Sequence, residues 1–440
     1  MKIAEMRKAR RVRWRALAAT SSVLTSLCGV CACGSEPSWR QHVSSVPPAR
    51  EVRVADEFGS SAHQPELAIE WASSTASPGS PGEGHGVLPH CAGFDAALAR
   101  VARAVAERQA ARQPGFEISE LVVMLRALGS PHVWPFVWTL EGNDLSSPVL
   151  EERWGASLGH VPSGGERRCG VARVPGLDGV EVVAAVAVDV LADLAPLPTR
   201  ARLGEWLRLE ARSVGGPSAA TVVLLGPRGA PRTVPSRLGS GRLHSVFSLD
   251  QAGLWRVQVL LSTEHGPRPA LEAWVFVDEE PSFRAGSSPA PGEAADVGLD
   301  VPLGGLRASL LQMVNAARFS EQRAPLRREA RLDDLAQEHA EAMLRAGRTA
   351  HDTGQGLPAE RVARAGVPAL RVGENVARAR RLPSAHRALW DSPAHRGNLL
   401  DDGFDAVGLG IVVEPSVGVW VCELFVDYAN GVTGMVPPGR

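Results

Sequence analysis

The fold of the last third of this chain is decided by the stretch Ser392-Pro393-Ala394-His395-Arg396-Gly397-Asn398-Leu399-Leu400. Upstream of it lie His351 and the segment Val372-Gly373-Glu374-Asn375-Val376. Imidazole and carboxylate are the groups that bind metals and transfer protons near neutral pH. Each of them lies beside turn-forming glycine or proline, where loops on a scaffold can converge on a cleft. We therefore take His351, Glu374 and His395 as the candidate residues for chemistry.

The same residues carry a resemblance to a known family. The region from Leu306 to Phe425 resembles a bacterial CAP (SCP-like) domain, of the superfamily of cysteine-rich secretory proteins, antigen 5 and plant pathogenesis-related proteins. The resemblance implies an α-β-α layered domain, which we place at residues 304–430, with His351, Glu374 and His395 facing a central cleft. The matching pieces occur in the family's order and are Val314-Asn315-Ala316-Ala317-Arg318, Ala324-Pro325-Leu326, Leu332-Asp333-Asp334-Leu335-Ala336-Gln337-Glu338-His339-Ala340, His351, Gly373-Glu374-Asn375, the stretch quoted above, and Phe404-Asp405-Ala406-Val407-Gly408-Leu409-Gly410.

Each candidate also has a plainer structural interpretation. His351 follows a helix predicted to start near Leu332, and a histidine there can cap the C-terminal carbonyl groups of that helix. His395 and Glu374 can be solvated loop residues. The resemblance favours the cleft for all three. His339 lies on the apolar stripe of the same helix, so we expect a buried, hydrogen-bonded histidine rather than a ligand.

One acid that the resemblance implies is missing. Eukaryotic relatives have a second glutamate shortly after the family's tryptophan, but here Trp390 is followed at that position by Pro393. Asp391 or Glu423 could take its place, and its loss weakens any general acid–base mechanism that needs two carboxylates. The ligand-binding residues that we expect are His351, Glu374, Asn375, His395, Asn398 and Glu423.

A zinc site is a further expectation. Two histidines can hold a metal only with additional ligands, and a closed structural zinc site needs four. His351 and His395, completed by Glu374 or water, would form an open and weak zinc site. The sequence contains no H-E-x-x-H motif, nucleophile elbow or phosphate-binding glycine loop. An ordinary metalloprotease or serine hydrolase is therefore not supported.

The N-terminus has the pattern of a secretory signal. Basic residues from Lys2 to Arg15 precede an apolar run from Ala16 to Ala32. This run is short and rich in Ser and Thr, which argues against a permanent transmembrane helix. It ends in Val30-Cys31-Ala32-Cys33, which resembles a bacterial lipobox and implies lipidation of Cys33 after removal of residues 1–32. The C-x-x-C spacing of Cys28 and Cys31 is an alternative redox or metal signal, but it falls inside the removed segment.

The 440 residues predict several domains. Residues 33–90 are rich in Ser, Pro, Gly and charge, and we expect them to form a disordered tether. Residues 91–197 combine helical spacing with β-rich segments around a turn at 175–179, which predicts an α/β domain. Short strand signals across 198–280 predict a small β-sandwich, for which an immunoglobulin-like fold is one candidate. Residues 281–303 form a linker.

The region 91–197 shares its order of elements with the final domain. Leu98-x-x-Val101-Ala102 parallels Leu332-x-x-Leu335-Ala336, and Cys169-Gly170-Val171-Ala172 parallels Val407-Gly408-Leu409-Gly410. The first region contains neither Gly-Glu-Asn nor His-Arg-x-Asn. We hypothesise that it is a degenerate CAP-like copy without the site. The alternative is an unrelated α/β domain.

Cysteine usage fits an exported protein. Cys91 and Cys169 flank the first domain and are expected to pair in an oxidising compartment. Cys422 lies where many eukaryotic relatives have a strand cysteine, whose usual partner position is Leu409 here. The resemblance thus implies that Cys422 is a buried free thiol, which acts as a small apolar residue.

Charge and motifs limit the function. Loss of the signal moves the formal charge from −1 to about −7, which argues against a nucleic-acid partner. We expect an exported protein, anchored to the membrane by lipid at the cell envelope or outer membrane, or else secreted. Its cleft would bind a small ligand, lipid or peptide. The alternative is an envelope or extracellular hydrolase that uses the His/Glu cleft, with or without zinc, and the missing acid and nucleophile favour binding.

Overall fold

The structure is a computed structural model, and it describes residues 70–71, 88–143, 145–158, 165–263, 266–283, 290–293, 298, 300–414 and 418–428. The expected signal segment and Cys33 lie outside these residues, as does most of the expected tether. Within the described residues, no helix is long and apolar enough to cross a bilayer. One strand of the expected tether, β1 (Glu70–Trp71), pairs antiparallel with β7 (Leu197–Pro198).

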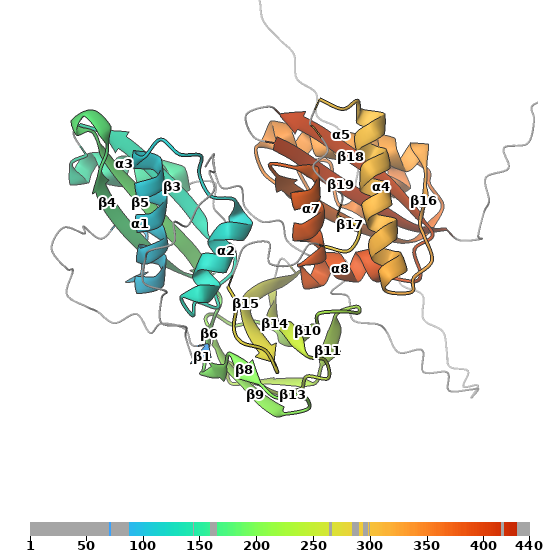
Figure 1. Cartoon of the computed structure of the whole chain (residues 1–440), viewed down its shortest axis with the longest axis horizontal. Coiled ribbons are helices and arrows are strands. Elements are labelled where there is room, and N and C mark those ends of the chain that lie inside the picture. The colour runs from blue at the N-terminus through green and yellow to red at the C-terminus, as the bar shows by residue number, and fades with distance from the viewer. Residues whose placement is uncertain are drawn as a thin grey trace, which may run out of the picture. The chain divides into compact units, whose positions relative to one another are not determined.

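The first domain contains β2 (Gly93–Phe94), α1 (Ala96–Ala110), α2 (Ile118–Ala127), β3 (Phe136–Gly142), α3 (Ser147–Leu158), β4 (Glu166–Pro175) and β5 (Glu181–Val190). Its sheet has the order β2-β4-β5-β3 (Figure 1). Helix α1 forms because apolar residues recur at helical spacing, and these residues are buried in the core. Asp95 caps this helix by accepting a hydrogen bond from the Leu98 amide at 2.9 Å. The predicted mixture of helices and a β-hairpin in this region is confirmed.

A disulfide joins Cys91 to Cys169 of β4, with Cα atoms 5.7 Å apart. It connects the segment that precedes β2 to the centre of the sheet. The two cysteines are separated by 78 positions in the chain. Closing a loop of that length restricts the unfolded chain and contributes about 4 kcal/mol in the chain-entropy description. Cys422 is free and buried.

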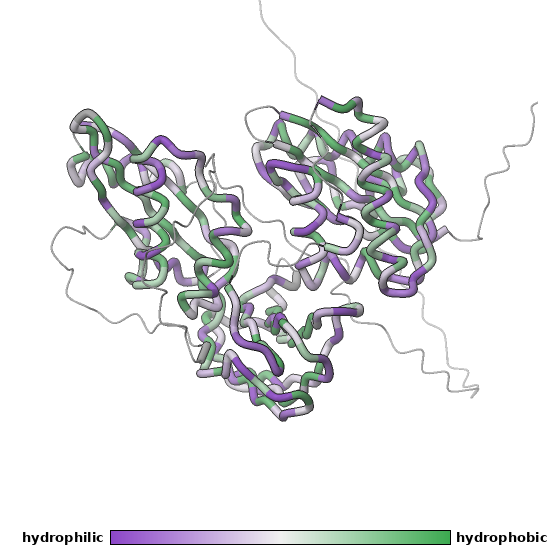
Figure 2. Tube along the Cα trace, in the orientation of Figure 1, coloured by the Kyte–Doolittle hydropathy of each residue, from purple (hydrophilic) through white to green (hydrophobic). Residues whose placement is uncertain are grey.

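The second domain is a sandwich of two sheets with the orders β11-β10-β14-β15-β8 and β12-β13-β9-β6. One apolar core lies between the two sheets. Buried and exposed residues alternate along β9 and β13, as expected for strands with one face in the core and one in solvent. The hydropathy of each residue is shown in Figure 2. The strands are β6 (Ala192–Leu194), β8 (Arg200–Ala201), β9 (Trp206–Ser213), β10 (Ala219–Leu225), β11 (Arg232–Val234), β12 (Ser236–Gly239), β13 (Arg242–Ser248), β14 (Gly253–Thr263) and β15 (Gly266–Val277).

The strand signals of this region lie at 206–209, 221–225, 254–259 and 273–277, and they fall on β9, β10, β14 and β15. Strand β13 was not predicted. In β13, Leu243, Ser245 and Phe247 are buried and alternate with exposed Arg242, His244 and Val246. This period of two is a strand signal, but the exposed arginine and histidine hide it in any average of hydropathy.

The final domain contains α4 (Leu303–Ser320), β16 (Arg327–Arg328), α5 (Ala330–Ala346), α6 (Pro358–Arg364), β17 (Ala369–Ala379), α7 (Leu382–Trp390), α8 (Pro393–Leu400), β18 (Ala406–Glu414) and β19 (Gly418–Tyr428). Its sheet has the order β16-β18-β19-β17. Helices α4, α7 and α8 pack on one face of the sheet, and α5 packs on the other (Figure 1). This is the expected α-β-α layering.

Burial of the sheet on both faces explains the composition of its central strands. In β19 every residue from Gly418 to Val426 is buried, as is usual for a strand covered by helices on both sides. On the α5 side the helix lies very close to β18. A Cβ added at Gly408 would come within 2.2 Å of the carbonyl carbon of Leu332. Glycine at this position therefore allows the close approach of helix and strand.

The first and final domains have the same strand order. Numbered along the chain within each domain, both sheets run first-third-fourth-second. In both domains, the short first strand pairs parallel with the third strand. The long helix begins two residues after the end of the first strand. A Cβ added at Gly170 would lie 2.2 Å from the carbonyl carbon of Leu98, the same approach as that between Gly408 and Leu332.

Candidate functional site

The candidate residues of the final domain lie around strand β17. Glu374 and Asn375 are consecutive on this strand, and neighbouring strand residues point to opposite faces of a sheet. The Glu374 side chain faces α5 and α6, where it meets residues of both helices. The Asn375 side chain faces α8 and the backbone of His395. The polar residues thus form two groups rather than one.

Glu374 is the centre of the first group and is only 5% exposed. Its Oε1 accepts a hydrogen bond from Nδ1 of His351 at 2.9 Å. Its Oε2 forms an ion pair with Arg361 of α6 and accepts a weak hydrogen bond from Sγ of Cys422 at 3.4 Å. Burial alone raises the pKa of Glu374, but the His351 hydrogen bond and the Arg361 charge outweigh burial and bring this pKa below its usual range.

The loop after α5 brings His351 to this carboxylate. Gly347 ends α5 in the left-handed conformation, with φ of 63°. His339, on α5, is fully buried and donates from Nε2 to the Ala350 carbonyl at 2.7 Å. This bond holds the loop next to the position of His351. His339 is thus the buried, hydrogen-bonded histidine expected from the sequence, although its Nε2 also lies 3.6 Å from Glu374 Oε1. Burial lowers the pKa of His339, which favours its neutral form.

The second group links Asn375, Asn398 and Glu423. The Asn375 amide donates to Glu423 Oε2 at 3.0 Å, and the Asn398 amide donates to Asn375 Oδ1 at the same distance. Asn398 also donates to the backbone carbonyl of Glu374 at 3.2 Å. The three side chains therefore tie β17, β19 and α8 together. Of the two acids that could replace the missing glutamate, Glu423 is the one bound to Asn375.

Glu423 has an unusual environment for an acid. It is fully buried, and its Oε1 has no hydrogen-bond partner among the described residues. Burial raises the pKa of Glu423 to about 7, and the hydrogen bond from Asn375 offsets this only in part. The contrast with Glu374 has a simple cause, because Arg361 lies beside Glu374, whereas none of the described residues places a cation beside Glu423.

His395 lies on α8, and its backbone carbonyl accepts from the Asn375 amide at 3.1 Å. The residue is partly buried. This burial, together with the nearby charge of His351, lowers the pKa of His395 to about 3. At neutral pH this imidazole is therefore uncharged and keeps its capacity to accept a hydrogen bond or to ligate.

The predicted zinc site has no complete set of ligands among the described residues. Across the described ranges, no three His, Cys, Asp or Glu side chains are grouped as ligands for one ion. The carboxylate of Glu374 is already bound by His351 and Arg361. A zinc site on His351 and His395 thus stays a prediction.

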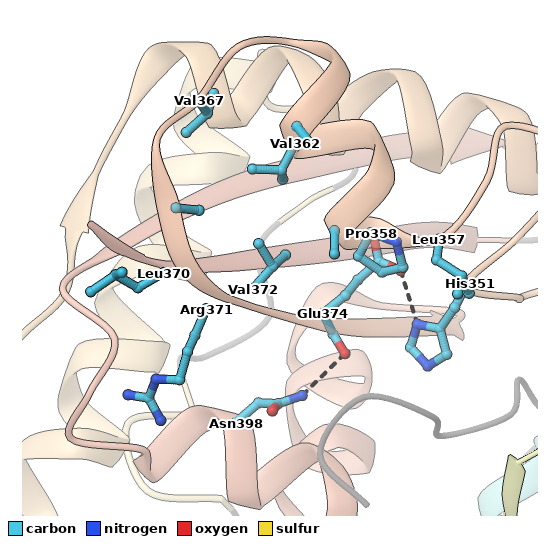
Figure 3. Close-up of a pocket in the computed structure, with 13 residues that line it drawn as sticks. His351, Leu357, Pro358, Val362, Val367, Leu370, Arg371, Val372, Glu374 and Asn398 are labelled. Atoms are coloured by element: carbon cyan, nitrogen blue, oxygen red, sulfur yellow. Dashed lines mark hydrogen bonds and ion pairs between the residues drawn. The ribbon is translucent and has the colours of Figure 1, made fainter. Parts of the chain in front are cut away.

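A cavity of about 190 Å³ adjoins the Glu374 group. Figure 3 shows side chains of α6 and β17 around it, with His351 and Glu374 joined at one end. Three of its lining residues, His351, Glu374 and Asn398, were predicted from the sequence, whereas its apolar wall was not. The other lining residues are Leu357, Pro358, Ala359, Val362, Ala363, Val367, Ala369, Leu370, Arg371 and Val372. The short α6 carried no sequence signal that pointed to a site.

The geometry agrees with an independent comparison of the sequence with known families. Residues 311–424 match the model of the CAP family, described as the cysteine-rich secretory protein family. The chain carries a C-terminal CAP domain. The predicted resemblance is thereby confirmed, and the layered domain with its His351–Glu374 pair is the CAP domain of this protein. A comparison with curated proteins found no matching sequence.

Solved structures similar to this chain include three bacterial proteins. An outer surface protein of Borrelia burgdorferi is 17% identical, with a TM-score of 0.28, and the match covers 30% of this chain and 99% of that protein. An extracellular SCP-domain protein of Bacillus anthracis is 14% identical, with a TM-score of 0.26, covering 54% and 85%. A cysteine-rich secretory protein of Staphylococcus aureus is 12% identical, with a TM-score of 0.26, covering 54% and 83%.

Proposed function

We propose that the CAP domain binds a small ligand through a short apolar group that enters the cavity between α6 and β17. The observation that carries this proposal is the composition of that cavity. Its wall is mostly apolar along α6 and the first half of β17, and the polar or charged residues that line it are His351, Arg371, Glu374 and Asn398. Few polar groups in a mostly apolar pocket are typical of small-molecule sites. At about 190 Å³ the cavity is smaller than the usual ~300–1,000 Å³, so it suits an acyl-chain end or an apolar side chain.

Binding fits the state of Glu374 better than hydrolysis does. A general base must have a lone pair free to take a proton from the substrate or water. In this protein the Glu374 carboxylate already accepts from His351 and Cys422 and is paired with Arg361. Its lowered pKa also makes it a weak base. These contacts support a preorganised binding site and give no support to the hydrolase alternative.

cis-Parinaric acid, a fluorescent fatty acid with a free methyl end, tests the proposal on the chain from residue 34 onward. Ala363 lines the cavity and is exposed on α6, so Ala363→Trp should block the entrance without disturbing the core. We expect the affinity for the probe to fall by a factor of about 10 or more, a loss of about 1.4 kcal/mol. Glu338→Trp, on the exposed side of α5, is the matched control and should leave affinity unchanged. Equal binding by the wild type and the Ala363→Trp variant would contradict the proposal.

We also propose that the protein is exported and tethered to a membrane by lipidated Cys33. The support is the basic region, the apolar run and the lipobox-like Val30-Cys31-Ala32-Cys33. In a bacterium with lipoprotein processing, the wild-type protein should stay with the membranes in high salt, whereas Cys33→Ser should be released from them by high salt or mislocalised. Membrane association of Cys33→Ser that survives high salt would contradict the lipid anchor.

We further propose that the first domain is a CAP-like copy without the site. Alignment of the two sheets through Gly170 and Gly408 puts apolar residues where the CAP domain has polar ones. Through the strand registers, Val137 corresponds to Glu374, Trp138 to Asn375 and Ala185 to Glu423. Trp138 packs against buried Trp154 of α3, with ring centroids 5.7 Å apart. Aromatic packing thus takes the place of the polar group, and this domain should show no binding of the probe.

A further inference from the structure

The outer face of the sheet β12-β13-β9-β6 carries four arginines. Side chains of β9 alternate between the core and solvent, and those of β13 do the same. The outward positions of β9 include Arg208 and Arg212, which are largely exposed. Arg237 of β12 and Arg242 of β13 are exposed too. We call this set, Arg208, Arg212, Arg237 and Arg242, the arginine face.

The strand register places like charges against each other on this face. Arg212 and Arg242 are direct cross-strand partners, and like charges in that position destabilise a sheet. Asp193 lies 3.2 Å from Arg212, and Glu210, on the same face of β9, lies 3.8 Å from Arg208, so two of the four charges are offset. Within the described residues, Arg237 and Arg242 have no ion-pair partner. The face therefore has an excess of positive charge, in a chain whose formal charge is −1.

Exposed apolar residues of β9 and β13 lie beside Arg208 on the same face. Trp206 is 72% exposed and opens the strand. Val246 of β13 is 51% exposed and is the direct partner of Arg208. Leu203, in the turn before Trp206, is 54% exposed. A large exposed indole is unusual in solvent, whereas tryptophan is enriched at the boundary between bilayer and water.

We propose that this face lies against a membrane surface and binds anionic lipid headgroups. Arginine forks match phosphate oxygens in geometry and charge, and an anion between Arg212 and Arg242 would relieve their repulsion. A lipid headgroup layer can make apolar contacts with Trp206, Val246 and Leu203. A free phosphate makes no such contacts. The membrane, rather than a soluble anion, is therefore the occupant that uses both halves of the face. This site is on the sandwich and is independent of the cavity in the CAP domain.

Co-sedimentation with lipid vesicles tests the proposal on the chain from residue 34 onward, which lacks the anchor because Cys33 is omitted. We expect binding to vesicles that contain phosphatidylglycerol and little binding to vesicles of phosphatidylcholine alone. Arg212→Glu/Arg242→Glu should weaken binding by a factor of about 25 or more, because each basic residue near an anionic surface contributes about fivefold. Trp206→Ala should also weaken it. Added salt should weaken wild-type binding through screening, a readout that does not depend on any variant folding.

The control variant carries the same change of charge on a different surface of the protein. Arg100→Glu/Arg103→Glu alters two exposed arginines of α1 and should bind like the wild type. Three outcomes would overturn the proposal: equal binding to neutral vesicles, unchanged binding by Arg212→Glu/Arg242→Glu, or retention on soluble dextran sulfate without binding to vesicles. The last of these would identify an anionic polymer as the partner instead.

Discussion

Glu374 and Asn375 are neighbours on β17, yet their side chains belong to two polar groups on opposite faces of the sheet. On one face, Glu374 is bound by Arg361 and His351 and has a lowered pKa. On the other, Asn375 binds Glu423, whose pKa is raised to about 7. The two buried acids should therefore respond to mutation and to pH in opposite ways.

Glu374→Gln should destabilise the CAP domain strongly. The change removes the carboxylate charge and leaves the Arg361 guanidinium buried without its counterion. Loss of one partner of a buried pair costs about 3–5 kcal/mol. Denaturant unfolding of the chain from residue 34 onward measures this loss. Glu338→Gln, an exposed site on α5, should change stability by less than ~0.5 kcal/mol, and an equally small effect at Glu374 would show that its ion pair is unimportant.

Glu423→Gln should remove a pH dependence of stability. Because the pKa of Glu423 is raised from 4.5 to about 7, the folded protein binds more protons than the unfolded chain between these values. Its contribution to the free energy of unfolding therefore falls as pH rises through this window, by about 3 kcal/mol in total. The stability of the variant relative to wild type should rise from pH 4.5 to 7 and then level off. Denaturant unfolding across this range measures it, and a constant difference would mean that Glu423 does not titrate there.

Buried histidines should make the protein sensitive to acid. Burial lowers the pKa of His386 to about 4, and burial together with His351 lowers that of His395 to about 3. For both, the unfolded chain binds more protons below pH 6.5, so their contribution to stability is complete above 6.5 and is lost as pH falls toward 4. His386→Asn should flatten the stability curve between pH 6.5 and 4, as seen in thermal melts. His244→Asn, at a half-exposed position, should leave the slope unchanged. Parallel curves for wild type and His386→Asn would refute this account.

Replacement of the glycine at the helix–strand contact should destabilise both domains to a similar extent. A Cβ at Gly408 or Gly170 would overlap the backbone of α5 or α1. We expect Gly408→Ala and Gly170→Ala each to cost about 1–3 kcal/mol or more through overpacking. Gly216→Ala is the control, since a Cβ there meets nothing within 4 Å. A large loss at Gly408 with none at Gly170 would argue against the two domains being copies of one fold.

The sequence by itself determined the identity of the CAP domain and its main elements. Local sequence patterns were sufficient to predict an element where they follow the repeat of a helix or strand or mark a turn. The apolar spacing in α1, the apolar alternation in β9 and the glycine turn between β4 and β5 each report on neighbours in the chain. The order of short motifs from Asn315 to Gly410 then identified the family.

Only the tertiary structure decided how the polar residues are grouped. Sequence reasoning placed six residues around one cleft. The period of two along β17 points Glu374 and Asn375 to opposite faces of the sheet, and Asn398 contacts both of them. Arg361 was not predicted. It lies on α6, whereas Glu374 lies on β17, and no local sequence pattern encodes a contact between the two elements. The same is true of the two pKa shifts. Both acids are buried, and what distinguishes them is whether a cation from elsewhere in the chain lies within reach.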